Sequence, residues 1–299
     1  MCRFKSAIIL KDRVFIPDYD SHSDMLDELG IEDTRQNAEK LFIRAELSPE
    51  NGDVFSNIDN WKFVVDQDIL PGWYVKDYDK QRMIEAVKEW AKDRIHICVD
   101  NLKINSGANH YIKDCKDVNI YGSATVKNIY GSATVKNIYG GATVENICDS
   151  ATVEYICDSA TVKNIYDSAT VEYICDSATV EYICDSATVK NICGSATVKN
   201  ICGSATVKNI YGSATVKNIY GGATVENICD SATVENICDS ATVETAKGFS
   251  TIRTSPYSKF NNRDKLILLE NATLKDCYEK KIYQSGDFKL VSVSNGKCE

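Results

Sequence analysis

The chain has 299 residues, 43 of them acidic and 34 basic, so its formal net charge at pH 7 is −9. Proteins that bind nucleic acid or anionic membranes gain affinity from a positive surface, and this balance therefore predicts neither partner. No stretch approaches the ~18 apolar residues needed to span a bilayer. Thirteen cysteines without a secretion-type start predict reduced thiols and a cytoplasmic protein.

Residues 1–108 predict an α/β capping domain. Strand-like apolar patterns cover 5–16, 41–47 and 61–65. A serine cap and a glycine stop predict a short helix over 21–30, and apolar residues at three- and four-residue spacing predict an amphipathic helix over 78–95. Short apolar stretches at 96–99, 102–104 and 118–120 would be irregular first coils of the next segment.

Residues 121–246 are fourteen consecutive nine-residue units of the type YGSATVKNI or CDSATVEYI. Positions 4, 5 and 6 are always Ala, Thr and Val, and position 9 is Ile until Ala246 ends the series. Position 1 is Tyr or Cys, position 2 Gly or Asp, and position 7 Lys or Glu. Thr-Val pairs disfavour helix, and Gly-Ser or Asp-Ser pairs favour turns. The fold class predicted is therefore mainly β, a thin parallel β-solenoid.

Side-chain alternation bears on whether one coil contains nine or eighteen residues. Val126 and Ile129 are three positions apart, so a single straight strand would turn one of them toward water. A two-residue turn at Lys127 and Asn128 would let both point inward. We therefore prefer one coil per nine-residue repeat, which at the ~4.8 Å strand spacing gives a rod of roughly 65 Å. An eighteen-residue coil, half as long and twice as wide, is the alternative.

The C-terminal flank predicts a small β cap over 251–299. The segment 248–263 is polar and is either a loop or a set of degenerate coils, and 265–269 and 288–293 have strand patterns. The bare ends of a stacked sheet would promote aggregation unless covered. The solenoid itself is then placed at 109–250, between the two caps.

Three parts of the sequence carry a family resemblance. They are the DSATV-type nonapeptides, the segment WKFVVDQDILPGWY at 61–74, and EWAK at 89–92. Together they resemble uncharacterised β-solenoid proteins of gut bacteria and their phages. The resemblance extends over nearly the whole chain and implies a thin solenoid. It implies no activity and no functional residues.

Cysteine occupies position 1 in eight repeats and could form a ladder of thiols that binds a soft metal. Zinc prefers four tetrahedral ligands, whereas one column offers sulfurs in a line, and tyrosine replaces cysteine in six repeats. We therefore expect no metal or cofactor. For the alternative of a soft-metal site, the candidate ligands are the position-1 cysteines Cys148, Cys157, Cys175, Cys184, Cys193, Cys202, Cys229 and Cys238.

The aspartates at position 2 resemble those of calcium-binding nonapeptide rolls only in part. Each unit lacks the second glycine of those rolls, and glycine often replaces the aspartate. We interpret these residues as turn-forming aspartates that bond to nearby backbone amides.

No catalytic constellation is present in the sequence. The histidines His22, His96 and His110 are scattered, and no GxSxG, phosphate-binding glycine loop or CxxC occurs. The repeats contain seven Lys, seven Glu and seven Asp, a net charge of −7, so an acidic mimic of DNA that binds a basic protein is one alternative function. Soft-metal binding is another. The sequence favours a non-enzymatic rod, spacer or platform for an as yet unidentified protein partner, as a monomer or low-order oligomer.

Overall fold

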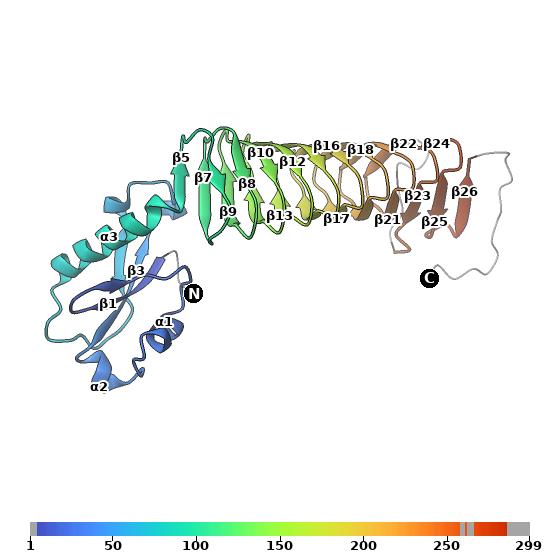
Figure 1. The fold of residues 1–299 in the computed structure, drawn as a ribbon. Helices are drawn as coiled ribbons and strands as arrows, with labels where there is room; N and C mark the ends of the chain where they lie inside the picture. Colours follow the sequence, from blue (N-terminus) through green and yellow to red (C-terminus); the bar gives the residue numbers. More distant parts are fainter. Residues whose placement is uncertain (1–4, 258–260, 262–265, 286–299) are drawn as a thin grey trace. The chain divides into compact units, whose positions relative to one another are not determined.

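The computed structural model describes residues 5–257, 261 and 266–285. These residues divide into two compact units, one ending at His96 but including Ala108–Tyr111, and the other comprising Ile97–Gly107 and the chain from Ile112 onward. Figure 1 shows helices only in the first unit and a stack of strands in the second.

The N-terminal unit combines a sheet with helices, as its sequence pattern predicts, and the sheet has four antiparallel strands. The strand order is β2-β1-β3-β4, with β1 at Lys5–Leu10, β2 at Val14–Phe15, β3 at Phe42–Ser48 and β4 at Lys62–Val65. The helices are α1 (His22–Glu28), α2 (Arg35–Ala38) and α3 (Lys76–Lys92), with short 3-10 turns at Glu50–Gly52 and Ile58–Asn60. The predicted strand over 5–16 is instead a hairpin, closed where Leu10 N–H donates to Arg13 O at 2.8 Å.

Apolar residues from the sheet and from α3 form the core of this unit. Trp61, Met83 and Val87 are essentially inaccessible to solvent and pack in one cluster with side chains from β1 and β3. The periodicity of the sequence identifies this face of α3 correctly, because Met83, Ile84 and Val87 are among its buried residues.

The second unit is a solenoid of parallel strands in two sheets. The even sheet contains β6 (Lys103–Ile104), β8 (Val118–Ile120), β10 (Thr134–Ile138), β12 (Thr152–Ile156), β14 (Thr170–Ile174), β16 (Thr188–Ile192), β18 (Thr206–Ile210), β20 (Thr224–Ile228), β22 (Thr242–Ala246) and β24 (Ile267–Leu268). The odd sheet contains β5 (Ile95–Ile97), β7 (His110–Lys113), β9 (Thr125–Tyr130), β11 (Thr143–Ile147), β13 (Thr161–Ile165), β15 (Thr179–Ile183), β17 (Thr197–Ile201), β19 (Thr215–Ile219), β21 (Thr233–Ile237), β23 (Thr251–Thr254) and β25 (Thr273–Asp276). The hairpin strand β26 (Lys281–Gln284) pairs antiparallel with β25.

Each coil contains eighteen residues, so the preferred nine-residue coil is wrong and the alternative is correct. Thr134 pairs with Thr152 and Thr143 with Thr161, so each strand pairs with the strand two repeats away. Successive repeats therefore lie in opposite sheets. The fourteen repeats make a stack of roughly 35 Å at the usual strand spacing, about half the length that we expected.

The predicted turn at Lys127 and Asn128 is also wrong, because β9 runs through both residues. Val and Ile of each repeat still both point inward. In the regular coils the register pairs positions 5, 6, 8 and 9 and passes over position 7. This irregularity shifts the alternation of side chains by one residue, so that positions 6 and 9 both face the core without a turn.

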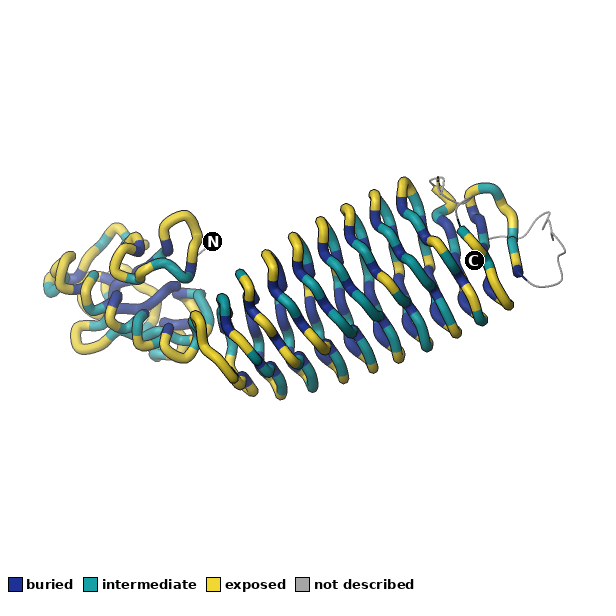
Figure 2. The backbone as a smooth tube through the Cα atoms, turned by 90° about the horizontal axis from the view of Figure 1, so that it is seen from above, coloured by how far each residue is buried: buried dark blue, intermediate teal, exposed yellow. Residues whose placement is uncertain are grey.

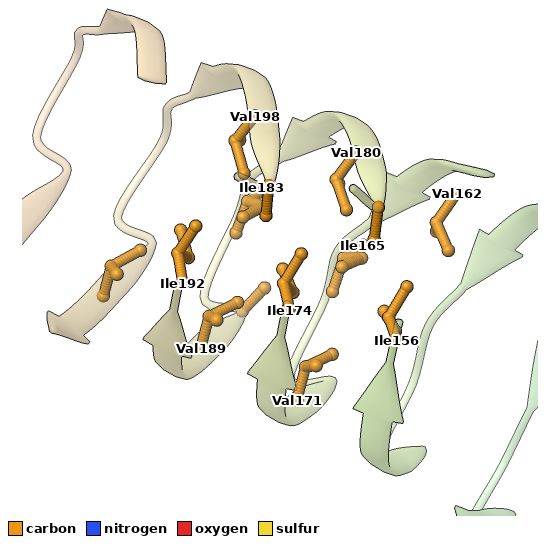
Figure 3. Packing of buried hydrophobic residues seen from close by; sticks show 14 of the residues in the cluster. Ile156, Val162, Ile165, Val171, Ile174, Val180, Ile183, Val189, Ile192 and Val198 are labelled. Carbon is orange, nitrogen blue, oxygen red and sulfur yellow. The ribbon is translucent and has the colours of Figure 1, made fainter. Parts of the chain in front are cut away.

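The core of the solenoid is one continuous apolar cluster. Nearly all Ala, Val and Ile residues at positions 4, 6 and 9 are fully buried, and the cluster extends from Ile104 to Leu274. Figure 3 shows Val and Ile side chains of the two sheets facing each other, including Ile174, Ile183 and Val189. Figure 2 shows buried segments recurring along every coil, with exposed residues at the turns.

The C-terminal flank continues the stack as irregular coils. Thr233 pairs with Thr251, eighteen residues on, but Thr251 pairs with Thr273, which is a longer step. Of the two predicted strands, 265–269 corresponds to the short β24, although its first residue falls outside the described residues, as does all of 288–293.

Candidate functional site: the corners and outer faces of the solenoid

The corner turns explain why position 2 alternates between Gly and Asp. In a typical corner, Ala151 N–H donates to Cys148 O at 3.2 Å, which closes a four-residue turn. Position 2 has a left-handed backbone, with φ of 57° at Asp149 and 68° at Gly131. Gly adopts this conformation without steric cost, and Asp is among the few other residues that tolerate it.

The aspartates also bind backbone amides of the preceding coil, as the sequence predicts. Asp149 Oδ2 accepts from Gly131 N–H at 3.0 Å, and Asp158 Oδ2 accepts from Gly140 N–H at 3.2 Å. The same contact joins Gly212 N–H to Asp230 at 3.1 Å. These carboxylates therefore connect neighbouring coils through the backbone.

Replacing Asp149 should separate the two roles of position 2. We expect Asp149→Ala to lower the free energy of unfolding by about 1–3 kcal/mol, because Ala is strained at positive φ and leaves Gly131 N–H without its acceptor. Asp149→Gly removes only the acceptor and should cost less than about 1 kcal/mol. Urea unfolding of the two variants measures the difference, and equal losses would contradict the role of the backbone conformation.

The eighteen-residue coil divides the predicted cysteine ladder between two corners. The first corner follows the even strands and contains Tyr121, Tyr139, Cys157, Cys175, Cys193, Tyr211 and Cys229; the second follows the odd strands and contains Tyr130, Cys148, Tyr166, Cys184, Cys202, Tyr220 and Cys238. The structure therefore brings together a run of three cysteines and a run of two. Cys148, Cys229 and Cys238 have no cysteine in the adjacent coils of their corners.

One cluster among these residues has metal-ligand spacing. The Sγ atoms of Cys157 and Cys175 and a carboxylate oxygen of Asp176 all lie within 4.8 Å of one another. Asp176 Oδ2 also accepts from Asp158 N–H at 3.4 Å. Two thiols and one carboxylate supply three of the four ligands that zinc prefers, and a soft ion that accepts two sulfurs would fit better.

Three thiols of these corners, those of Cys148, Cys175 and Cys184, are protonated at neutral pH. Burial, together with the nearby Asp176 and Cys157, raises the pKa of Cys175 to about 12. Burial and the neighbouring Cys202 raise the pKa of Cys184 to about 11, and burial raises that of Cys148 to about 11. A metal at Cys157 and Cys175 would have to displace these protons, and the thiols are weak nucleophiles at pH 7.

Thiol alkylation should therefore be slow and strongly pH dependent. The thiolate fraction of a group with a pKa of 11–12 rises about tenfold for each pH unit below that value. We expect iodoacetamide at pH 7 to leave Cys148, Cys175 and Cys184 unmodified while the exposed Cys98 reacts. Intact mass, followed between pH 7 and 9.5, counts the modified thiols. Modification of all cysteines within minutes at pH 7 would contradict the raised pKa values.

Positions 7 and 8 form outward columns on both sheets. We call the outer surface of β8 to β22 the even face and that of β9 to β21 the odd face. Asparagines at position 8 form ladders, with Asn137 Nδ2 donating to Asn119 Oδ1 at 2.8 Å and Asn146 Nδ2 donating to Asn128 Oδ1 at 2.9 Å. Side chains thus add to the backbone pairing between coils.

The two faces differ in the order of their charges. On the odd face Lys and Glu alternate over five coils and pair within the column: Glu145 lies 2.5 Å from Lys127 and 3.5 Å from Lys163, and Glu181 lies 2.7 Å from Lys199. On the even face like charges occupy adjacent coils, such as Glu154 and Glu172. An ion pair between position-7 side chains of this face joins Lys190 to Glu172. The order of repeats along the sequence did not reveal this difference in charge order. The difference appears only when residues eighteen positions apart are compared.

Tyrosines interrupt the asparagine ladder at the middle of the even face. Tyr155 and Tyr173 stack with ring centroids 5.2 Å apart and planes at 10°. Tyr155 is 39% exposed, about as much as Tyr182 at the same repeat position on the odd face. A stacked pair of an exposed Tyr155 and a half-buried Tyr173, beside Glu154 and Glu172, is the kind of surface that binds a partner.

The structure brings two of the histidines together, which sequence reasoning missed. His96 Nε2 and His110 Nδ1 are 3.3 Å apart, and the rings stack with centroids 5.5 Å apart. Burial, together with His110, lowers the pKa of His96 to about 4, so this ring is neutral at pH 7. Their sequence separation of fourteen gave no signal, because it depends on the unpredicted strand β7.

The third histidine also has neighbours that the sequence did not indicate. His22 Nδ1 lies 3.5 Å from Asp66 Oδ2, and its Nε2 lies 3.2 Å from Ala45 O. Donor atoms of His22, Glu46 and Asp66 lie within 4.8 Å of one another. The contact with the backbone carbonyl of Ala45 orients the His22 ring. We therefore interpret His22 as a packed histidine with two acidic neighbours.

Among the described residues, no helix has the length and apolar character needed to cross a membrane. Comparisons with protein-family models, with curated proteins and with solved structures found no match to this chain.

Proposed function

We propose that the protein is a non-enzymatic rod whose outer faces bind a protein partner. The observation that supports it best is the uniform construction of the coils: the buried columns repeat unchanged, and nearly all variation falls on the corners and the outward positions. Each coil pairs with both neighbours, so stability is shared along the stack and length can change in whole coils. Such a construction separates the folding of the rod from the surface it presents.

The test uses two kinds of variant in the organism that encodes the chain. Deletion of 229–246 removes one coil and shortens the rod by about 5 Å without changing the face of any remaining strand. A second variant exchanges the even-face residues Glu154, Tyr155 and Lys208 for serine. We expect the second variant to lose cellular function, because the replaced residues lie on the face that carries the interaction. Function that survives it but is lost in Cys175→Ser would overturn the proposal.

Soft-metal binding is a second candidate, supported by the Cys157, Cys175 and Asp176 cluster. Cadmium titration of the reduced protein would detect thiolate-to-metal absorption in the ultraviolet, and Cys175→Ser should abolish it. An unchanged titration in that variant would reject the site. The DNA-mimic alternative has weaker support, because on the odd face lysines pair with the glutamates and break up the acidic surface.

A further inference from the structure

The charges of the even face follow an order that is opposite on the two sides of its midpoint. Six consecutive strands, β10 to β20, carry plus, minus, minus, plus, plus and minus at position 7: Lys136, Glu154, Glu172, Lys190, Lys208 and Glu226. The midpoint lies between β14 and β16. Within these six strands, each charge on one side has the opposite charge at the same distance on the other side, whereas Glu244 in β22 has no charged counterpart in β8.

This order is unfavourable within a single chain. Glu154 and Glu172 occupy adjacent coils in register, as do Lys190 and Lys208, and like charges opposite each other in a sheet destabilise it. Lys190 pairs with Glu172, and Lys136 pairs with Asp117 at 3.1 Å, whereas within the described part of the chain Glu154 and Lys208 make no ion pair. The odd face avoids most such contacts by alternation. The even face therefore has charges that a partner could neutralise.

From this pattern we infer that the even face binds the even face of a second copy of the chain, with the two rods antiparallel. The two-fold axis would run along the strand direction between β14 and β16, so that each position-7 column meets the same column of the other copy. Glu172 then faces Lys190 of the second copy, and Glu154 faces its Lys208. Lys136 faces Glu226 in the same way. All six charges meet an opposite charge.

The sizes of the position-8 side chains fit the same axis. Tyr173 would face Asn191 of the second copy, and Tyr155 would face Asn209. A projecting tyrosine thus meets a short asparagine at both sites, whereas a shift of the axis onto β14 would set Tyr173 against itself. Tyr155 is 39% exposed and free to make this contact. The aromatic pair therefore disfavours an axis on β14, and the charges disfavour an axis on β16, where Glu154 would face Glu226.

The corners strengthen the contrast between the two halves. Beside Glu154 and Glu172 the first corner has Asp158 and Asp176, and beside Lys190 and Lys208 it has Gly194 and Gly212. Asp158 and Asp176 of one copy would thus face Gly212 and Gly194 of the other, and Asp230, which follows β20, would face Gly140. This arrangement favours electrostatic steering of the two copies into the antiparallel alignment.

The size of the face predicts a weak association. Six strands of five residues cover about 30 Å by about 16 Å, so two copies would bury roughly 900–1,000 Å² in total, below the range of stable dimers. Because most of the attraction is electrostatic, it should weaken strongly with salt. This inference rests on the proposed function in so far as the even face is taken as a binding surface, and it names the partner.

Sedimentation velocity of the full chain at increasing concentration tests the inference. We expect a dimer in about 20 mM salt and at least a tenfold weaker association in about 300 mM salt. Glu154→Lys should abolish the dimer, and adding Lys208→Glu in the same chain should restore it. Far-UV circular dichroism confirms that the variants are folded.

A mixing experiment makes the test more specific. A chain with Glu154→Lys and Glu172→Lys and a chain with Lys190→Glu and Lys208→Glu should each be monomeric alone and should form a one-to-one dimer together. Exchange of Lys163 and Glu181 on the odd face is the matched control and should leave the dimer unchanged. A monomer at all concentrations in low salt, no association on mixing, or an equal effect of the odd-face exchange would overturn the inference. Retention of cellular function by a chain held monomeric in this way would leave the rod proposal standing with a different partner.

Discussion

Replacing Ile165 with aspartate is expected to lower the free energy of unfolding by more than about 4 kcal/mol. Ile165 lies in β13, is inaccessible to solvent, and pairs in register with Ile147 and Ile183 in the coils on either side. A carboxyl group there has no partner, and protonation does not remove the cost of burying a polar group. Because every coil contacts only its neighbours, the damage should open the stack locally and divide it into two shorter stacks.

Thr161→Asp in the same strand provides the matched control. Thr161 faces outward and is half-buried, so the same substitution there should cost less than about 1 kcal/mol. Urea unfolding gives the loss, and limited proteolysis should cut the Ile165 variant close to β13 while leaving the control intact. Equal stability of the two variants would contradict the inward orientation of position 9.

Trp61→Ala should destabilise the N-terminal unit by about 3–5 kcal/mol and leave the solenoid folded. Trp61 is 1% exposed, packs in the core of that unit, and donates from Nε1 to Ser56 Oγ at 2.9 Å. The variant loses both the packing and this hydrogen bond. Since Trp73 and Trp90 also belong to the N-terminal unit, tryptophan fluorescence reports that unit, whereas far-UV circular dichroism is dominated by the strands of the repeats.

The measurement is therefore a comparison of two unfolding curves for one protein. The fluorescence transition should move to lower denaturant concentration, and the dichroism transition of the repeats should stay in place. Trp61→Phe keeps most of the packing and should recover more than half of the loss. A parallel shift of both transitions would show that the two units unfold together.

The columns of the solenoid could be predicted because they depend on local chemistry. A β-branched Thr-Val pair followed by Ile, with Gly or Asp at each turn, specifies strands and left-handed corners in any coil of this kind. The predicted role of the aspartates was confirmed for the same reason: Asp149 needs only its own backbone conformation and one amide from the adjacent coil.

The coil size could not be deduced from the alternation of side chains alone. The reasoning treated the strand as regular, and Val126 and Ile129 then required a turn between them. The strand instead skips one residue of its register at position 7, which brings both residues inward. Nothing in the identity of Lys127 or Glu145 signals this irregularity, because both residue types occur in regular strands as well.

The error in coil size propagated to the candidate site. With nine residues per coil, Cys148 and Cys157 would be neighbours, whereas they occupy opposite corners, and Cys157 lies beside Cys175 instead. The even and odd faces become distinct only at the eighteen-residue period.

The distance between two spin labels on the even face tests the eighteen-residue coil most directly. Thr134 in β10 and Thr242 in β22 are separated by six coils of this size, or about 29 Å, and by twelve coils of nine residues, or about 58 Å. Labels attached through a genetically encoded keto amino acid avoid reaction with the native cysteines, and measurement in high salt with excess unlabelled chain removes distances between copies. Pulsed electron–electron double resonance should give a distance near 29 Å between the two labels. A distance near 58 Å would contradict the two-faced solenoid described above.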